Sequence, residues 1–191
     1  RFKNSLYLLN LSKNLELEKI ADEIFNEKSE LIVVDGYISK VSNEKILDWH
    51  QDQAFSGKKN LDEKELKHPD DGFIKFFFFL TDVRYNNGSL AYIPKSNTVS
   101  KAFKKALYEK KIIYQPFWKL KDFRNQLINN KEIILKYISE SSFTNFLNNS
   151  NFIEKNNDTD LYDKNLIQGD AMIFDEHGVH RASRPSINDR Y

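Results

Sequence analysis

The feature that most constrains the fold is the phenylalanine-rich segment from Phe73 to Val83. Four consecutive phenylalanines occupy positions 76–79, so this part of the segment has no polar face. A strand without a polar face must be covered on both sides, as a central strand of a two-layer β structure is. The segment therefore predicts the strongest strand of the chain, and a two-layer β fold around it.

A turn and a returning strand are predicted directly after this segment. Asn86, Asn87 and Gly88 form a turn signal, and Ser89 to Ile93 has strand character before Pro94 closes it. Turn residues between two apolar runs are typical of an antiparallel hairpin. We therefore expect the two strands to pair with each other.

Helical patterns lie on both sides of the strand region. Apolar residues recur at helical spacing from Leu15 to Phe25, and Leu31 to Val34 is a short β-branched run that predicts a strand. Long amphipathic stretches rich in Lys and Asn predict a helical insert at about residues 97–164, after which strand character returns. The expected fold is mainly β with helical additions. We expect a double-stranded β-helix (cupin-like jelly roll) with N-terminal helices and that insert.

Composition excludes several partners and sites. The chain carries 29 Lys and Arg against 28 Asp and Glu, a net charge of +1, so no binding to nucleic acid or to an anionic membrane is expected. It has no cysteine, so a metal must be held by nitrogen and oxygen atoms. The first residues of the given sequence show no basic segment followed by an apolar one, and no apolar run approaches the roughly 20 residues of a membrane span, so we expect a soluble, cytoplasmic protein.

The candidate chemistry lies in the few histidines. His50 and Asp52 are two residues apart, which places both side chains on one face of an extended strand. Taken alone, this pair is weak evidence for a metal site, and the alternative interpretation is a polar pair at the surface. A third imidazole from the segment 168–180 would complete a set of two histidines and one carboxylate, which suits non-haem Fe(II). Arg190 follows His180 by ten residues and could clamp a carboxylate with its planar fork, in a chain with only 6 Arg among its 29 basic residues.

Four blocks in order along the chain carry a resemblance. They are Trp49 to Gln53 with its His-x-Asp, Asn87 to Asn97, the pair Gly169 and Asp170 with His180 ten residues after that aspartate, and Arg190. This pattern resembles the phytanoyl-CoA dioxygenase family of Fe(II)/2-oxoglutarate-dependent oxygenases.

The resemblance implies a role for each matching residue. His50, Asp52 and His180 would bind Fe(II), and Arg190 would pair with the 5-carboxylate of 2-oxoglutarate. With O2, the co-substrate would be converted to succinate and CO2 while an unactivated C–H bond of a small-molecule or acyl substrate is hydroxylated. Because Asp52 is a carboxylate, hydroxylation is favoured over halogenation.

The sequence departs from the family pattern in three places. Lys95 and Asn97 stand in the segment that is usually Pro-Gly-Ser-His, and the interval between the two histidine ligands is lengthened by the insert. Ala182 stands where many members carry Ser or Gly, so a contact to 2-oxoglutarate is lost there, and Ser183 is the candidate to replace it.

The remaining polar and aromatic residues have two interpretations each. His177 is expected to be an outer-sphere or a surface residue, and His68 a solvated loop residue. Arg181 and Arg184 are either surface charges or a basic rim that attracts an anionic substrate. Insert aromatics could form the core of a helical cap or line the substrate site; they include Tyr114, Phe117, Trp118 and Phe123.

The sequence therefore predicts a 2-oxoglutarate-dependent dioxygenase. We expect residues 1–191 to be a single catalytic domain cut short at its C-terminus. The first alternative is a cupin-like metal-binding protein without oxygenase activity, an isomerase or a sensor. The second is an interaction module that uses the insert, which leaves the ligand spacing unexplained. Neither substrate identity nor oligomeric state follows from the sequence.

Overall fold

The computed structural model describes residues 2–3, 5–36, 38, 40–41, 47–52, 71–83, 87–113, 119–156 and 165–183. Its strands form three small antiparallel sheets, of order β1-β2, β3-β7-β5 and β4-β6. The strands are β1 (Phe2–Lys3), β2 (Asp35–Gly36), β3 (Leu47–His50), β4 (Ile74–Phe78), β5 (Leu90–Tyr92), β6 (Ala171–Asp175) and β7 (His180–Ala182). The helices are α1 (Leu6–Asn14), α2 (Leu17–Phe25), α3 (Ser96–Tyr108), α4 (Leu120–Asn129), α5 (Lys131–Ile134) and α6 (Glu140–Lys155).

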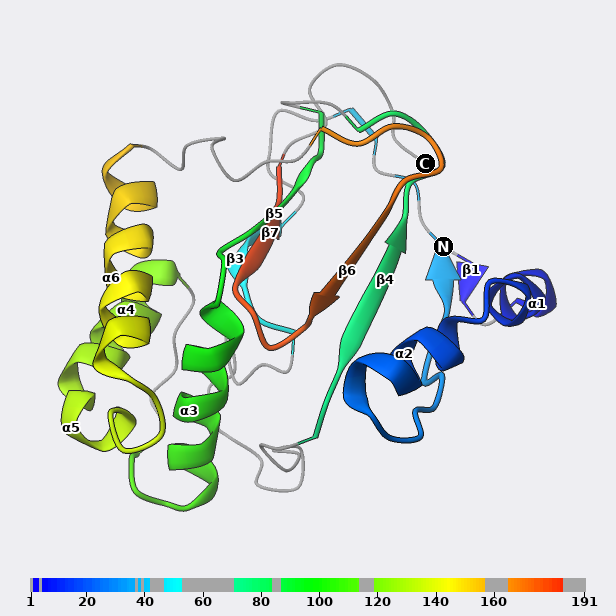
Figure 1. The fold of residues 1–191 in the computed structure, drawn as a ribbon. Helices are drawn as coiled ribbons and strands as arrows, with labels where there is room; N and C mark the ends of the chain where they lie inside the picture. Colours follow the sequence, from blue (N-terminus) through cyan, green and yellow to red (C-terminus); the bar gives the residue numbers. More distant parts are fainter. Residues whose placement is uncertain are drawn as a thin grey trace.

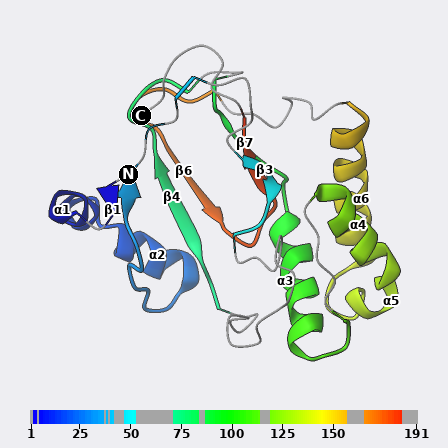
Figure 2. The same cartoon turned by 180° about the vertical axis from the view of Figure 1, so that it is seen from behind.

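From β3 onward, successive strands alternate between two sheets. β3, β5 and β7 belong to the three-stranded sheet, whereas β4 and β6 form the two-stranded one. Figures 1 and 2 show α3 to α6 beyond the three-stranded sheet, and α1, α2, β1 and β2 beyond the two-stranded one. The two sheets therefore lie between two groups of helices.

The predicted hairpin is wrong. β4 pairs with β6, from Ile74 opposite Asp175 to Phe78 opposite Ala171, and β5 pairs with β7. The turn signal does separate two strands, but local sequence does not determine whether the second strand pairs with the first or enters the facing sheet. Here it enters the facing sheet.

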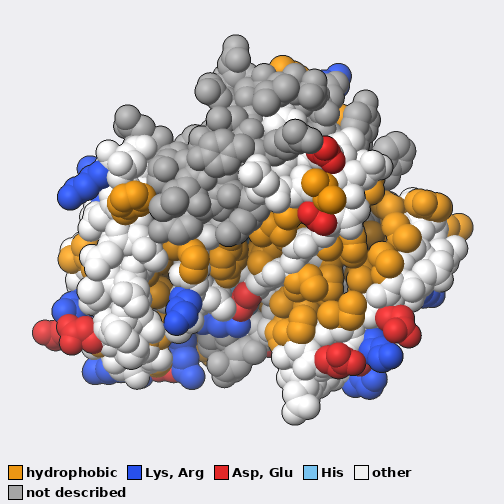
Figure 3. Space-filling model, turned by 45° about the horizontal axis from the view of Figure 1, so that its top comes forward, with side chains coloured by type: hydrophobic (Ala, Val, Ile, Leu, Met, Phe, Trp, Pro, Cys, Tyr) orange, Lys and Arg blue, Asp and Glu red, His pale blue; other side chains and the backbone are white. Residues whose placement is uncertain are grey.

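The expectation that the phenylalanine run is covered on both sides is also wrong. Among the described strands, β4 has a single neighbour, β6. Phe79 is buried, but Phe78 is 38% exposed. Ile173 on the neighbouring strand is 46% exposed. Figure 3 shows hydrophobic side chains at the surface over the central part of the molecule.

The "mainly β" expectation is not confirmed for the described residues. Helices account for more of them than strands do, and none of the three sheets closes into a barrel. Much of this helix lies between β5 and β6, where the sequence predicted an insert. A closed jelly roll is thus not established by the described strands.

The N-terminal elements differ from expectation in detail. The helix predicted from Leu15 to Phe25 is present as α2, but α1 precedes it, capped by the Ser5 hydroxyl, which accepts from the Leu8 N–H. A serine directly before an apolar stretch is the usual start signal of a helix. The strand predicted at Leu31 to Val34 is absent, and the chain pairs as β2 only at the next two residues.

The main hydrophobic core lies between the three-stranded sheet and helices α3 to α6. Aromatic rings connect the helices edge to face: Phe103 with Phe123 at 5.4 Å and Phe123 with Phe146 at 5.7 Å between ring centroids. Trp49 of β3 and Ala91 of β5 belong to the same buried cluster. Full burial of each such phenylalanine contributes about 1.5–3 kcal/mol. Phe123 is therefore a core residue, whereas Tyr114, Phe117 and Trp118 lie outside the described residues.

No helix among the described residues has the length and apolar character needed to cross a membrane.

Candidate metal centre

The end of β3 and the start of β7 bring two predicted ligands together. His50 and His180 are opposite each other in the β3–β7 register, and their ring centroids are 4.4 Å apart. Asp52 follows β3, and its backbone N–H donates to the Glu176 carbonyl at 3.3 Å. One ligand atom from each of His50, Asp52 and His180 lies within 4.8 Å of the others.

Both imidazoles are oriented with the same nitrogen toward the carboxylate. The Nδ1–H of His50 donates to the Asp48 carbonyl at 2.6 Å, and that of His180 donates to the Gly178 carbonyl at 2.9 Å. A carbonyl can only accept, so Nδ1 carries the hydrogen in each ring and the Nε2 lone pair remains for a ligand.

The two Nε2 atoms face the oxygens of Asp52. His180 Nε2 is 3.0 Å from Asp52 Oδ2, and His50 Nε2 is 3.6 Å from Oδ1. In neutral rings these nitrogens and the carboxylate all present lone pairs, so the arrangement favours a positive species among them, either a proton on a ring or a metal cation. A divalent cation suits that requirement, and nitrogen with carboxylate oxygen suits iron(II).

The electrostatics keep Asp52 ionised. Burial opposes its charge, but hydrogen bonds with His180 and His50 outweigh burial and hold the pKa of Asp52 well below its usual range. Burial also opposes protonation of His50, yet its contacts with Asp52 and the Asp48 carbonyl raise the pKa of His50. Protons and metal would therefore compete for His50, while the Asp52 carboxylate is available at any ordinary pH.

A sequence model described as Phytanoyl-CoA dioxygenase (PhyH) matches residues 7–186. The chain belongs to the phytanoyl-CoA dioxygenase family. Comparison with curated proteins and comparison with solved structures each gave no match.

Membership in the phytanoyl-CoA dioxygenase family implies a cupin-like fold and points to an iron(II)- and 2-oxoglutarate-dependent oxygenase. The cluster of His50, Asp52 and His180 fits the metal site of such an enzyme. The resemblance carried by the sequence blocks is thus confirmed at the level of the family.

Two charged residues beside the cluster were not predicted as site residues. Lys75 of β4 places Nζ 2.5 Å from Asp52 Oδ2 and 3.6 Å from a carboxylate oxygen of Glu176, which follows β6. The sequence feature that could have indicated this contact is Lys75 itself, a single cation within a phenylalanine-rich strand. Such a residue requires a partner, and the structure supplies two carboxylates.

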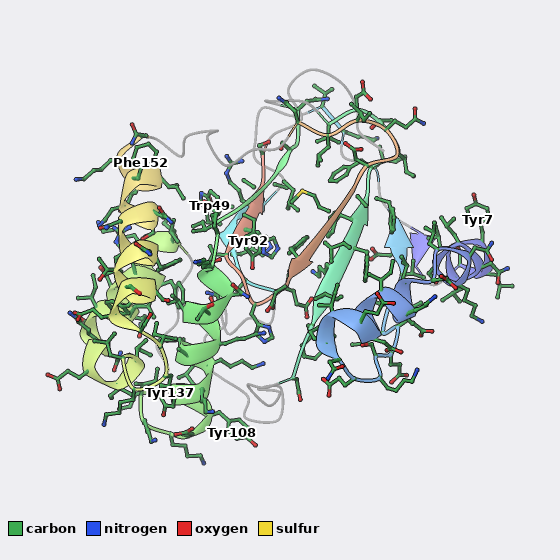
Figure 4. The ribbon with its side chains drawn as sticks, viewed as in Figure 1. Tyr7, Trp49, Tyr92, Tyr108, Tyr137 and Phe152 are labelled. Atoms are coloured by element: carbon green, nitrogen blue, oxygen red, sulfur yellow. The ribbon has the colours of Figure 1, made fainter. Side chains whose placement is uncertain are left out.

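Aromatic rings pack around His180. The ring of Tyr92 lies nearly parallel to it, at 6.4 Å and 14°, and the ring of Phe174 lies 5.0 Å away. Phe77 contacts Phe174 in turn, at 5.5 Å. Figure 4 labels Trp49 and Tyr92, which lie on β3 and β5, the two outer strands of the three-stranded sheet on either side of β7. The rings of Tyr92, Phe174 and Phe77 give the metal cluster an apolar flank.

His177 is buried and is separate from the ligand cluster. Its ring is 2% exposed, with Nδ1 2.9 Å from Asp175 Oδ1 and Nε2 3.2 Å from Nζ of Lys104. Asp175 also accepts from Lys101 at 2.7 Å and from Asn97 at 3.2 Å, both on α3. The surface interpretation of His177 is therefore wrong: the residue ties the turn between β6 and β7 to α3.

Replacement of Asp175 should change the pH dependence of stability. Burial opposes its charge, but hydrogen bonds from His177 and Lys101 outweigh burial and hold the pKa of Asp175 below its usual range. A carboxyl with a depressed folded-state pKa stabilises the protein above its unfolded-state pKa and loses that contribution as pH falls. The stability advantage of wild type over Asp175→Asn should therefore be largest near neutral pH and shrink below about pH 4.

Urea unfolding of both proteins at several pH values measures this difference. Asp22→Asn is the matched control, because the Lys28 partner of Asp22 is 96% exposed and the pair should contribute less. A difference between wild type and Asp175→Asn that does not change with pH would contradict the assigned ion pair.

The remaining predicted residues fall outside the cluster or outside the described residues. Arg181 is 1% exposed and its guanidinium lies 5.1 Å from the ring of Trp49, so both the surface-charge and the basic-rim interpretations of Arg181 are wrong. The Ser183 hydroxyl donates to the Ser89 carbonyl at 3.2 Å, and strand alternation places Ser183 on the face opposite His180. Its predicted role toward 2-oxoglutarate stays a prediction. Three other residues named in the sequence predictions lie outside the described part of the chain: His68, Arg184 and Arg190.

Proposed function

We propose that this chain is an Fe(II)- and 2-oxoglutarate-dependent dioxygenase that hydroxylates an unactivated C–H bond of a small-molecule or acyl substrate. The observation that carries the proposal is the cluster of His50, Asp52 and His180, with both Nε2 atoms facing one carboxylate. Membership in the phytanoyl-CoA dioxygenase family supplies the reaction class.

In this proposal each residue of the cluster has one task. His50, Asp52 and His180 would hold the metal, and the carbonyls of Asp48 and Gly178 fix the histidine rings. The bound iron supplies the activation of O2 and the oxidative decarboxylation of 2-oxoglutarate to succinate and CO2. The protein contributes position and an apolar surrounding.

Two further parts of the proposal rest on sequence position and topology. Arg190 is proposed to pair with the 5-carboxylate of 2-oxoglutarate, a task that suits a planar guanidinium better than an ammonium. The alternation of β3 to β7 between two sheets supports a jelly roll as the complete fold, because two sheets linked in this way form its sandwich.

The test is a titration without oxygen. The Fe(II)-loaded protein should develop a visible charge-transfer band when 2-oxoglutarate is added, and admission of O2 should then yield succinate. Arg190→Lys should weaken 2-oxoglutarate binding by at least about tenfold, a loss of about 1.4 kcal/mol, and leave Fe(II) binding unchanged.

Two outcomes would contradict the proposal in different ways. Fe(II) binding without any 2-oxoglutarate binding would favour the cupin-like metal-binding protein without oxygenase activity. An equal loss of affinity for Fe(II) and for 2-oxoglutarate in Arg190→Lys would contradict the role assigned to Arg190.

A further inference from the structure

Lys75 shares one carboxylate oxygen with the metal cluster. Its Nζ is 2.5 Å from Asp52 Oδ2, the same oxygen that lies 3.0 Å from His180 Nε2. The second carboxylate near Lys75 belongs to Glu176, at 3.6 Å. The ammonium is therefore in contact with an oxygen that the cluster offers to a cation.

The surroundings make a cation at this position necessary. The side chains of Asp52 and Glu176 are 24% and 11% exposed, so water screens their charges only in part. Carboxylates in such positions are costly unless they are paired. Lys75 reaches both, because strand alternation turns its side chain to the face of β4 that also carries Phe77, toward the cluster.

We propose that Lys75 is the counterion of Asp52 in the metal-free protein, and that a metal ion must displace it from Asp52 in order to bind. This inference rests on the metal site of the proposed function. Lys75 and the metal compete because both are cations that require the same oxygen, and like charges at such distances repel. Glu176 is the carboxylate that retains Lys75 once Asp52 is engaged.

The proposal predicts an unusual sign for a substitution beside a metal site. Lys75→Met should bind Co(II) more tightly than wild type, by about tenfold, because one competing charge is removed. The metal-free form of Lys75→Met should unfold at a lower temperature, because Asp52 loses its counterion. Lys75→Gln, which is also neutral, should show the same two changes, and Lys75→Arg should behave like wild type.

Lys101→Met is the matched control. Lys101 is 35% exposed against 33% for Lys75 and is also paired with an aspartate, Asp175, but it is not in contact with the cluster. Its replacement should lower the unfolding temperature without tightening Co(II) binding. The readouts are anaerobic Co(II) titration by visible absorption and thermal unfolding with and without the metal.

A second pair of variants tests whether Glu176 acts by holding Lys75 away from Asp52 or through its charge alone. Glu176→Gln should weaken Co(II) binding in the wild-type background, because Lys75 then remains on Asp52. In the Lys75→Met background the same change should have little effect, since there is no lysine to retain. Loss of equal size in both backgrounds would show that Glu176 acts on the metal directly and would overturn its assigned role.

The outcomes also separate this inference from the function on which it rests. Wild-type protein that binds no Co(II) overturns both. Wild-type protein that binds Co(II), with Lys75→Met binding it equally or more weakly, overturns only the competition and makes Lys75 a residue that supports the ligand.

Discussion

His180→Ala is expected to reduce the affinity for Fe(II) or Co(II) by more than about a hundredfold, beyond the 10–100-fold typical of residues that only support a ligand. The variant removes the Nε2 atom that lies 3.0 Å from Asp52 Oδ2 and leaves only His50 and Asp52 as donors. The measurement is an anaerobic metal titration, accompanied by circular dichroism to confirm that the variant is folded.

The chain provides a closely matched control for this experiment. His177 is three residues away and is 2% exposed against 4% for His180, but it is not part of the ligand cluster. His177→Ala should keep metal affinity within a few-fold of wild type while losing about 1–3 kcal/mol of stability, because Lys104 and Asp175 lose a buried partner. Metal binding that survives in His180→Ala and disappears in His177→Ala would exchange the two assignments.

Gly178→Ala is expected to reduce both stability and metal affinity. A Cβ at this position would lie 1.8 Å from Oη of Tyr92 and 2.1 Å from its Cζ, far inside contact distance. The tyrosine cannot move freely, since its hydroxyl donates to the Asp175 carbonyl and its ring lies against His180. We expect a loss of about 3 kcal/mol in the free energy of unfolding, at the upper end of overpacking effects.

The metal should be affected because the same residue orients a ligand. The Gly178 carbonyl accepts from His180 Nδ1, so a displaced turn would release the ring and lower affinity by about tenfold or more. Gly36→Ala is the control, with only Leu8 at 4.0 Å from its added Cβ. In a Tyr92→Leu background the added cost of Gly178→Ala should largely disappear; a cost that persists would show that Tyr92 is not the obstacle.

Part of the ligand cluster could be predicted from local spacing, namely the pair of His50 and Asp52, whereas His180 was assigned by the family pattern. His50 and Asp52 share a face through the two-residue period of an extended chain, and the position of His180 after Asp170 matched the family pattern. The helices between β5 and β6 were predictable for a similar reason, since their apolar residues recur at helical separations.

Features that depend on which strands meet were not predictable. Local pattern cannot decide between a hairpin and a crossing to the facing sheet, so the partner of β5 was assigned wrongly. The burial of Arg181 depends on the ring of Trp49 from another strand, and that of His177 on Lys104 from α3. Lys75 gave a local signal, but its partner Asp52 lies 23 residues away, and only the fold shows that they meet.

The four residues that run from the end of β6 through the following turn alternate between two tasks. Asp175 and His177 use their side chains to hold α3, whereas Glu176 and Gly178 use their backbone carbonyls to hold Asp52 and His180. Insertion or deletion of one residue in this turn would reverse the alternation. Side chains that now contact α3 would then point away from it, and the carbonyls that now accept from Asp52 and His180 would be displaced. The contacts that hold α3 and the contacts that hold the metal ligands are therefore separated by a single peptide bond.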